Sequence, residues 1–139
     1  MICTFDANFL TSGLIAQPGG TIDAILEAWR VGRFNVALSQ HIYDELTRTL
    51  AEPYFANRVP AYAIANYLAF VVQQSTFYPI IVTVAGVATH PEDDLVLATA
   101  LSAGAAYLVT GDRRFRSRVP RYQGVTLVSS AEFLAVIGA

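Results

Sequence analysis

The chain alternates short apolar runs with segments of helical periodicity. The apolar runs lie at 2–5, 34–38, 79–84, 105–110 and 124–128. They are hydrophobic without strict alternation, which is typical of strands buried on both faces. Helical segments are expected at 21–32, 39–52, 60–74 and 91–103, with a last short helix from Ser129 or Ser130 to about Val136. Buried strands separated by helices indicate an α/β fold. We therefore predict a three-layer α/β/α sandwich with a parallel sheet.

The predicted helices carry recognisable ends. Gly32 follows the first helix, as glycine commonly does at a helix stop, and Ser39 is placed to cap the second. Pro60 suits the first turn of the third helix, 60–74. That helix is apolar nearly all round, so we expect it either to be sandwiched in the core or to form part of a subunit interface.

Composition adds one feature to this picture, an excess of hydrophobic residues. Of the 139 residues, 54% are hydrophobic and 14% are charged, and the mean hydropathy is +0.43. The length suits one domain, residues 1–139, and so apolar a chain is expected to form a homodimer or an apolar partner interface. Residues 59–91 hold no charged side chain, but prolines, amides and Gly86 interrupt them before the roughly 20 apolar residues that a membrane span needs. We expect no membrane association.

The charged residues limit the partners and the compartment. The net charge is −2 at pH 7 and the isoelectric point is about 5.5, so binding of a polyanion must rely on a local basic patch or on bound metal. Every basic residue is an arginine. The single cysteine, Cys3, excludes an internal disulfide, and the first residues lack the basic region of a signal peptide. We therefore expect a cytoplasmic protein.

Two acidic residues follow predicted strands. Asp6 comes directly after the strand at 2–5, and Asp112 follows the strand at 105–110 after one glycine. The carboxyl ends of parallel strands meet at one edge of the sheet, where the binding sites of such folds form. Each residue also has a simpler explanation, because an aspartate in this position can cap the next helix or turn.

Three consecutive acids begin the helix at 91–103. At about 100° per residue, Asp94 falls on the same face as Leu97 and Leu101, which is the apolar face of the helix. Glu92 falls on the opposite side, and Asp93 lies on the flank. A carboxylate on a buried face needs a partner, since an uncompensated buried charge is costly.

A further acid, Glu45, lies at the edge of the apolar face of its helix, so a solvated flank remains an alternative for it. The chain has no lysine, and the arginines of 113–121 lie beyond these helices. Carboxylates that converge at one edge raise one another's pKa values unless a cation neutralises them, and Mg²⁺ and Mn²⁺ prefer oxygen ligands. We therefore expect a metal site formed by four acids, Asp6, Glu45, Asp94 and Asp112.

The segments that carry these acids resemble the PIN-domain family of metal-dependent ribonucleases. The resemblance extends in particular to the bacterial and archaeal PIN toxins of type II toxin–antitoxin systems, the VapC-like proteins and related toxin components. The matching segments are "FDANFLTS", "SQHIYDEL", "EDDLVLATALSAGAAYLVTGDRRF" and the closing "GVTLVSSAEFL". They cover nearly the whole chain in the family's order.

This resemblance implies a parallel sheet of strand order 3-2-1-4-5. It also implies an Mg²⁺- or Mn²⁺-dependent endoribonuclease, with RNA as substrate and a cognate antitoxin as partner. It assigns the metal ligands to Asp6, Glu45, Asp94 and Asp112, and it expects Asp93 to assist through water. Three further residues are expected to support the site by hydrogen bonds: Asn8, Ser12 and Thr110.

A cluster of arginines follows Asp112. Five lie within nine residues: Arg113, Arg114, Arg116, Arg118 and Arg121. Beside a site that cleaves RNA, the first four are expected to bind the RNA backbone. A solvated surface with a few ion pairs is the alternative. His41 and His90 are expected at helix caps or on the surface rather than in catalysis.

Other α/β proteins with an acid after the first strand fit less well. Phosphoaspartate receivers and most aspartate-nucleophile phosphatases use a lysine, which this chain lacks. A nucleotide-binding module needs a glycine-rich loop after the first strand, and a serine hydrolase needs G-x-S-x-G; the sequence has neither. The alternative that remains is a catalytically silent PIN-like scaffold that acts in protein or nucleic-acid binding.

Overall fold

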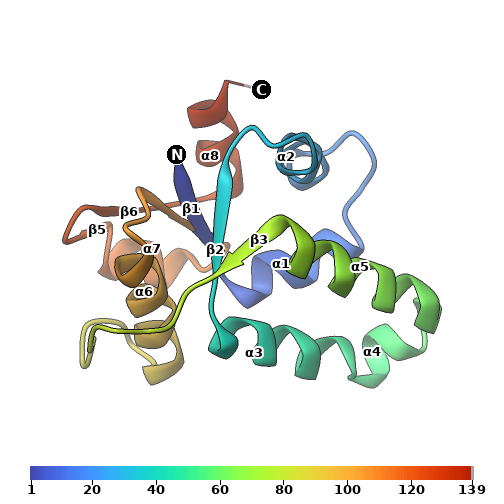
Figure 1. Cartoon of the computed structure of the whole chain (residues 1–139), viewed down its shortest axis with the longest axis horizontal. Helices are drawn as coiled ribbons and strands as arrows, with labels where there is room; N and C mark the ends of the chain where they lie inside the picture. Colours follow the sequence, from blue (N-terminus) through green and yellow to red (C-terminus); the bar gives the residue numbers. More distant parts are fainter. Residues whose placement is uncertain (139) are drawn as a thin grey trace.

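The computed structural model describes residues 1–138, whose helices lie on both faces of a central sheet (Figure 1). The strands are β1 (Ile2–Phe5), β2 (Asn35–Leu38), β3 (Ser75–Phe77), β4 (Tyr107–Val109), β5 (Arg121–Tyr122) and β6 (Val125–Val128). The helices are α1 (Ala7–Leu14), α2 (Thr21–Arg30), α3 (Gln40–Leu50), α4 (Pro53–Ala56), α5 (Ala61–Gln74), α6 (Pro91–Ala103), α7 (Arg113–Arg118) and α8 (Ser130–Ile137).

The sheet confirms the predicted α/β sandwich. Its strand order is β3-β2-β1-β4-β6-β5, and every pairing is parallel except that of β5 with β6. The parallel strands, numbered among themselves, therefore follow the expected order 3-2-1-4-5. The unexpected β5 is a hairpin partner of β6, joined to it by Gln123 and Gly124, both with positive φ, as a tight hairpin turn requires.

Aromatic side chains fill one side of the sheet. The ring centroid of Phe5 in β1 lies 4.4 Å from that of Phe9 in α1, 5.4 Å from Trp29 in α2 and 6.0 Å from Phe133 in α8. Helix α6 contacts β1, β2 and β4. Because α6 joins the edge strand β3 to β4 across the sheet, a right-handed crossover places it on the opposite face. The sheet is thereby enclosed by two helical layers.

The third parallel strand lies earlier in the chain than predicted. The strand expected at 79–84 is wrong, because β3 ends before it and this run has no regular structure. The amide of Tyr78 still donates to the carbonyl of Leu38 at 2.8 Å, but Pro79 has no N–H to continue the ladder. The apolar run then leaves the sheet, and Ile81 is 73% exposed.

Helix α5 is not sandwiched in the core, which removes one of the two alternatives for this apolar segment. Val71 is its one buried residue, and Tyr62 is 71% exposed. Its position at a subunit interface remains a prediction. Within residues 1–138, no helix combines the length and the hydrophobicity that a membrane crossing requires.

Candidate functional site

Asp6 lies where β1 ends and α1 begins. It caps α1, because its Oδ1 accepts the amide of Phe9 at 2.7 Å, and its Oδ2 accepts the hydroxyl of Thr110. Only 6% of the residue is exposed. The capping role thus exists, and it fixes a buried carboxylate at the carboxyl edge of the sheet.

Thr110 links the ends of two neighbouring strands. It directly follows β4, and its hydroxyl donates to Asp6 and accepts the amide of Asp112 at 3.1 Å. Asp112 caps α7, since its Oδ1 accepts the amide of Phe115 at 3.1 Å. One buried hydroxyl therefore holds Asp112 beside Asp6.

Asp93, in the first turn of α6, faces the same edge. Burial is the main cause that raises the pKa of Asp6 to about 6; the two hydrogen bonds that Asp6 accepts oppose it, and the charges of Asp93 and Asp112 add to it. Burial also raises the pKa of Asp93, as do the charges of Asp112 and Glu45. Asp93 and Asp112 line one cavity of about 50 Å³. We call these four carboxylates the acidic group: Asp6, Glu45, Asp93 and Asp112.

Asp94 does not join the acidic group. It is buried, as its position on the apolar face predicts, but its partners are backbone amides. Its Oδ2 accepts the amide of Gly86 at 3.0 Å and its Oδ1 accepts the amide of Ala88 at 2.7 Å. The geometry therefore gives Asp94 a structural role in the loop before α6. It brings Asp93, and not Asp94, close to Asp6.

Glu45 reaches the acidic group from α3. Its Oε1 lies 3.1 Å from Nε2 of His41, one helical turn earlier, and the same nitrogen lies 3.2 Å from the carbonyl oxygen of Glu92. His41 thus stands between α3 and the start of α6. Its spacing of four residues from Glu45 is the sequence signal that could have identified it.

Asn8 and Ser12 lie on one exposed side of α1. They line a separate cavity of about 90 Å³ with Gly111 and Ser130. Of the three residues expected to support the acids by hydrogen bonds, Thr110 makes such a bond in this structure. Asn8 and Ser12 are neighbours of the site rather than direct partners of the acids.

Of the five arginines after Asp112, two bond backbone carbonyls near the site. Arg116 donates to the carbonyl of Thr110 at 2.6 Å, and Arg118 donates to the carbonyl of Val87 at 2.9 Å. Both guanidinium groups thereby hold backbone near the site. Arg113 and Arg114 are exposed, and Arg114 lines the cavity of Asp93 and Asp112.

The acidic group offers the oxygen donors that a divalent cation binds, although its side chains do not converge on one point. Among residues 1–138, no three acidic, histidine or cysteine side chains are close enough to form a ready metal cluster. Over the same residues, the ion pairs are Arg30 with Glu27 and His41 with Glu45, so no arginine pairs with the acidic group. Carboxylate oxygens that no arginine neutralises suit Mg²⁺ or Mn²⁺.

The N-terminal ends of helices also affect the electrostatics of the acidic group. The acids Asp6 and Asp112 cap α1 and α7, Asp93 lies in the first turn of α6, and Glu45 is in the second turn of α3. Three helices, α1, α6 and α7, therefore begin at members of the acidic group. Their N-terminal ends carry partial positive charge, which stabilises the carboxylates placed there.

Comparison with known proteins relates this geometry to a family. A family model of the PIN domain matches residues 3–114. No curated protein matches the chain. The solved structure of VapBC2 from Rickettsia felis, bound to a DNA fragment from its promoter, superposes with a TM-score of 0.63 at 14% identity, covering 93% of this chain and 98% of that one. PAE2754 from Pyrobaculum aerophilum superposes with a TM-score of 0.57 at 18% identity, covering 99% and 98% of the two chains.

Proposed function

The chain belongs to the PIN domain family, and from this premise we propose that it is an Mg²⁺- or Mn²⁺-dependent endoribonuclease that hydrolyses RNA phosphodiester bonds. PIN domains are generally nucleases. The observation that carries the proposal is the acidic group at the carboxyl edge of the sheet, where neighbouring carboxylates add to the burial that raises the pKa values of Asp6 and Asp93, and where no arginine among residues 1–138 pairs with one of these acids. A cation would remove that repulsion.

The residues of the site have two proposed roles, holding the metal ion and positioning the acids that hold it. Asp6, Asp93 and Asp112, with Glu45 from α3, would hold the ion. When bound, such an ion lowers the pKa of water and stabilises charge on the phosphoryl oxygens. Thr110 positions Asp6 and Asp112 through its hydroxyl. Asp94 is a positioning residue, because it orders the loop that precedes α6.

Two exposed arginines are the proposed contacts to the RNA backbone. Arg114 shares a cavity with Asp93 and Asp112, and Arg113 is its exposed neighbour. The guanidinium group suits phosphate oxygens, and a patch of this kind supplies the attraction that a net charge of −2 does not. Arg116 and Arg118 instead steady the backbone around the site.

The biological role we propose is that of the toxin in a type II toxin–antitoxin pair. It rests on the family and on the fold shared with VapBC2 from Rickettsia felis. A cognate antitoxin protein, a homodimer and a cytoplasmic location belong to the same proposal. We also propose that residues 1–139 act as a single domain.

Cleavage of RNA by the purified protein tests this function. Full activity is expected with Mg²⁺ or Mn²⁺, none with chelator, and a loss of at least about a hundredfold in Asp6→Asn and Asp112→Asn, because each variant removes one charge from the acidic group. The matched control is Glu52→Gln, an exposed acid outside the acidic group that accepts no capping hydrogen bond. It should cleave as the wild type does.

A different result would support the catalytically silent scaffold. That alternative gains some support from the separation of the acidic side chains over residues 1–138. It would be correct if no RNA were cut under any metal condition, or if Asp6→Asn cut RNA as fast as the wild type.

A further inference from the structure

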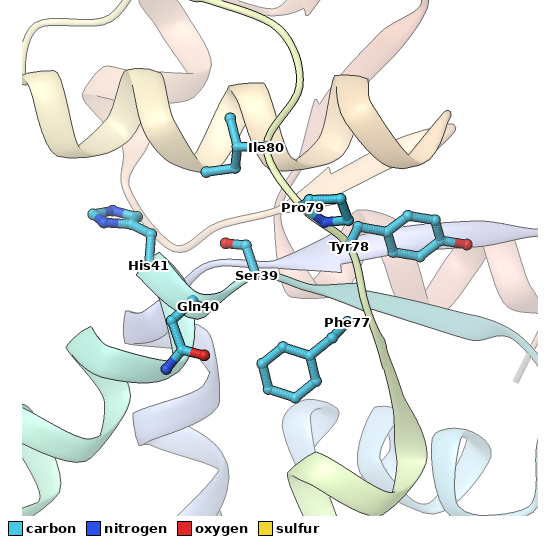
Figure 2. A pocket seen from close by; sticks show the side chains of 7 residues that line it. All are labelled: Ser39, Gln40, His41, Phe77, Tyr78, Pro79 and Ile80. Atoms are coloured by element: carbon cyan, nitrogen blue, oxygen red, sulfur yellow. The ribbon is translucent and has the colours of Figure 1, made fainter.

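A cavity outside the acidic group lies at the carboxyl ends of β2 and β3. It measures about 400 Å³, within the usual range for small-molecule sites. Figure 2 shows its lining, which comes from the first turn of α3 and from the chain that leaves β3. The acidic group does not explain this cavity, because none of its four carboxylates lines it.

The lining combines an aromatic surface with amide groups. The Phe77 ring, 42% exposed, lies on the same side of the opening as the Gln40 amide, whereas the ring of Tyr78 points away (Figure 2). Phe77 is steadied by Tyr43, whose ring centroid lies 6.0 Å from its own at an angle of 64°. Pro79 and Ile80 complete an apolar wall. This is a surface on which a flat, uncharged ring could stack.

Gln40 supplies polarity at the edge of that surface. Its Nε2 donates to Oδ1 of Asp44 at 2.8 Å, which orients the side chain. A glutamine amide has two donor hydrogens and a carbonyl acceptor, so one hydrogen and the oxygen can still bond a ligand. An aromatic face with an amide at its edge is the pairing that recognises unstacked bases in single-stranded RNA.

His41 connects this cavity to the acidic group. It lines the cavity, and its Nε2 lies 3.1 Å from Oε1 of Glu45. His41 therefore lies between the cavity and Glu45, one of the four acids of the acidic group. An RNA strand whose phosphate lies at the acidic group could therefore place a neighbouring base in the cavity.

We propose that the cavity between α3 and the end of β3 is a nucleobase subsite, in which Phe77 stacks on a base next to the cleaved bond and Gln40 bonds its edge. The inference rests on the proposed ribonuclease function and deepens it, because it assigns residues that select the sequence to be cut. An apolar segment of a protein partner is the competing occupant. The polar edge of Gln40 and the adjoining acidic group favour the base.

Nucleotide binding to the whole chain without metal tests the subsite directly. In ¹H–¹⁵N NMR titrations with AMP, GMP, CMP and UMP, the amides of Gln40, His41 and Phe77 should shift with at least one base, and ribose 5-phosphate should not shift them. Phe77→Ala should weaken that binding about tenfold, as loss of one stacking contact does. The control Tyr54→Ala removes an aromatic ring that is 50% exposed but outside the cavity, and it should leave the dissociation constant unchanged.

Cleavage of an RNA library gives a second, independent readout. Gln40→Ala should flatten the base preference at one position next to the cut, while cleavage remains dependent on metal. If bases shift Gln40 and Phe77 but no RNA is cut, the nuclease function fails and the subsite stands. If RNA is cut but Phe77→Ala and Gln40→Ala change neither binding nor preference, the subsite is wrong and the nuclease stands. Shifts caused by an apolar peptide and by none of the nucleotides would assign the cavity to a protein partner.

Discussion

Asp93 and Asp94 are adjacent in the chain and have different tasks in the structure. Asp94 binds the amides of Gly86 and Ala88, so its charge is compensated by the loop it orders. Asp93 lies beside Asp112 in a small cavity, and burial together with that neighbouring charge raises its pKa. At the scale of single residues, a position on the buried face of a helix does not by itself show that an acid binds a ligand.

The pKa of Asp6 leads to a prediction for the metal-free protein. Burial raises that pKa from 3.8 to about 6, so between these values the folded state holds a proton that the unfolded state has released. Asp6 therefore costs no stability below about pH 4; its cost grows as the pH rises from about 4 to 6 and is constant at higher pH, where both states are ionised. Asp6→Asn should increase the free energy of unfolding at pH 7.5 by about 2–3 kcal/mol, measured by urea denaturation in chelator.

The same comparison at lower pH separates charge from other effects of the substitution. The advantage of Asp6→Asn should shrink as the pH falls toward 4, because wild-type Asp6 is then protonated when folded. Glu52→Gln, which changes an exposed acid, should show no such trend. An equal difference at both pH values would mean that ionisation of Asp6 is not its cause.

The sequence places the acids that follow strands, but it does not separate Asp93 from Asp94 at the start of α6. Asp6 and Asp112 could be placed from chain order alone, since parallel strands end at one edge. Helical periodicity favours Asp94 as the direct ligand and leaves Asp93 to assist through water, because periodicity measures burial and a buried carboxylate suggests a metal. The loop amides that compensate Asp94 are long-range features of the fold, which no periodicity encodes.

At the scale of elements, the contact between α1 and α5 depends on a glycine. The hydroxyl of Tyr67 in α5 donates to the carbonyl of Leu10 in α1, and a Cβ at Gly13 would lie 2.3 Å from that Tyr67 oxygen. Tyr67 is partly buried and packs against the core, and its hydrogen bond fixes the hydroxyl in place. A residue without a side chain at position 13 leaves room for the Tyr67 hydroxyl beside α1.

Gly13→Ala should therefore lower the free energy of unfolding by about 1–3 kcal/mol, the usual cost of overpacking, as measured by urea denaturation. Adding Tyr67→Phe, which removes the clashing oxygen, should recover part of the loss. Gly111→Ala is the matched control, because a Cβ there meets no atom within 4 Å. A Gly13→Ala protein as stable as Gly111→Ala would contradict this account of the contact.

At the scale of elements, the structure also explains why β3 lies at Ser75–Phe77 and not at 79–84 as predicted. Both 75–77 and 79–84 contain residues suited to a strand, and the second is the more apolar. Pairing is decided by which backbone amides reach β2, and the ladder stops where Pro79 has no N–H. The strand order could be expected from the resemblance, whereas the exact register could not be read from hydrophobicity.

At the scale of the whole molecule, the excess of apolar residues reappears as exposed surface. The outer face of α5 carries Tyr62, Ala65, Ala69 and Val72, all exposed. The composition predicted a surplus of this kind but not its location. We predict that this face contributes to a homodimer, because no part of the described chain covers it.

Ala69→Arg tests that dimer. Arginine is a good helix former, so the fold should persist, while a charge in the middle of the face should prevent association. Light scattering coupled to size exclusion should give twice the chain mass of 15.1 kDa for the wild type and the single mass for the variant. A monomeric wild type, or a variant that remains dimeric, would rule out this interface.

Binding of Mn²⁺ to the acidic group is the most direct test of the account as a whole. Calorimetric titration should show binding by the wild type and a loss of at least about tenfold in affinity for Asp93→Asn, whose melting temperature should not fall. Asp94→Asn should melt at lower temperature, because one loop amide loses its acceptor, and should keep more of the metal affinity than Asp93→Asn. Unchanged Mn²⁺ binding in Asp93→Asn, or binding lost in Asp94→Asn alone, would contradict the assignment of the site.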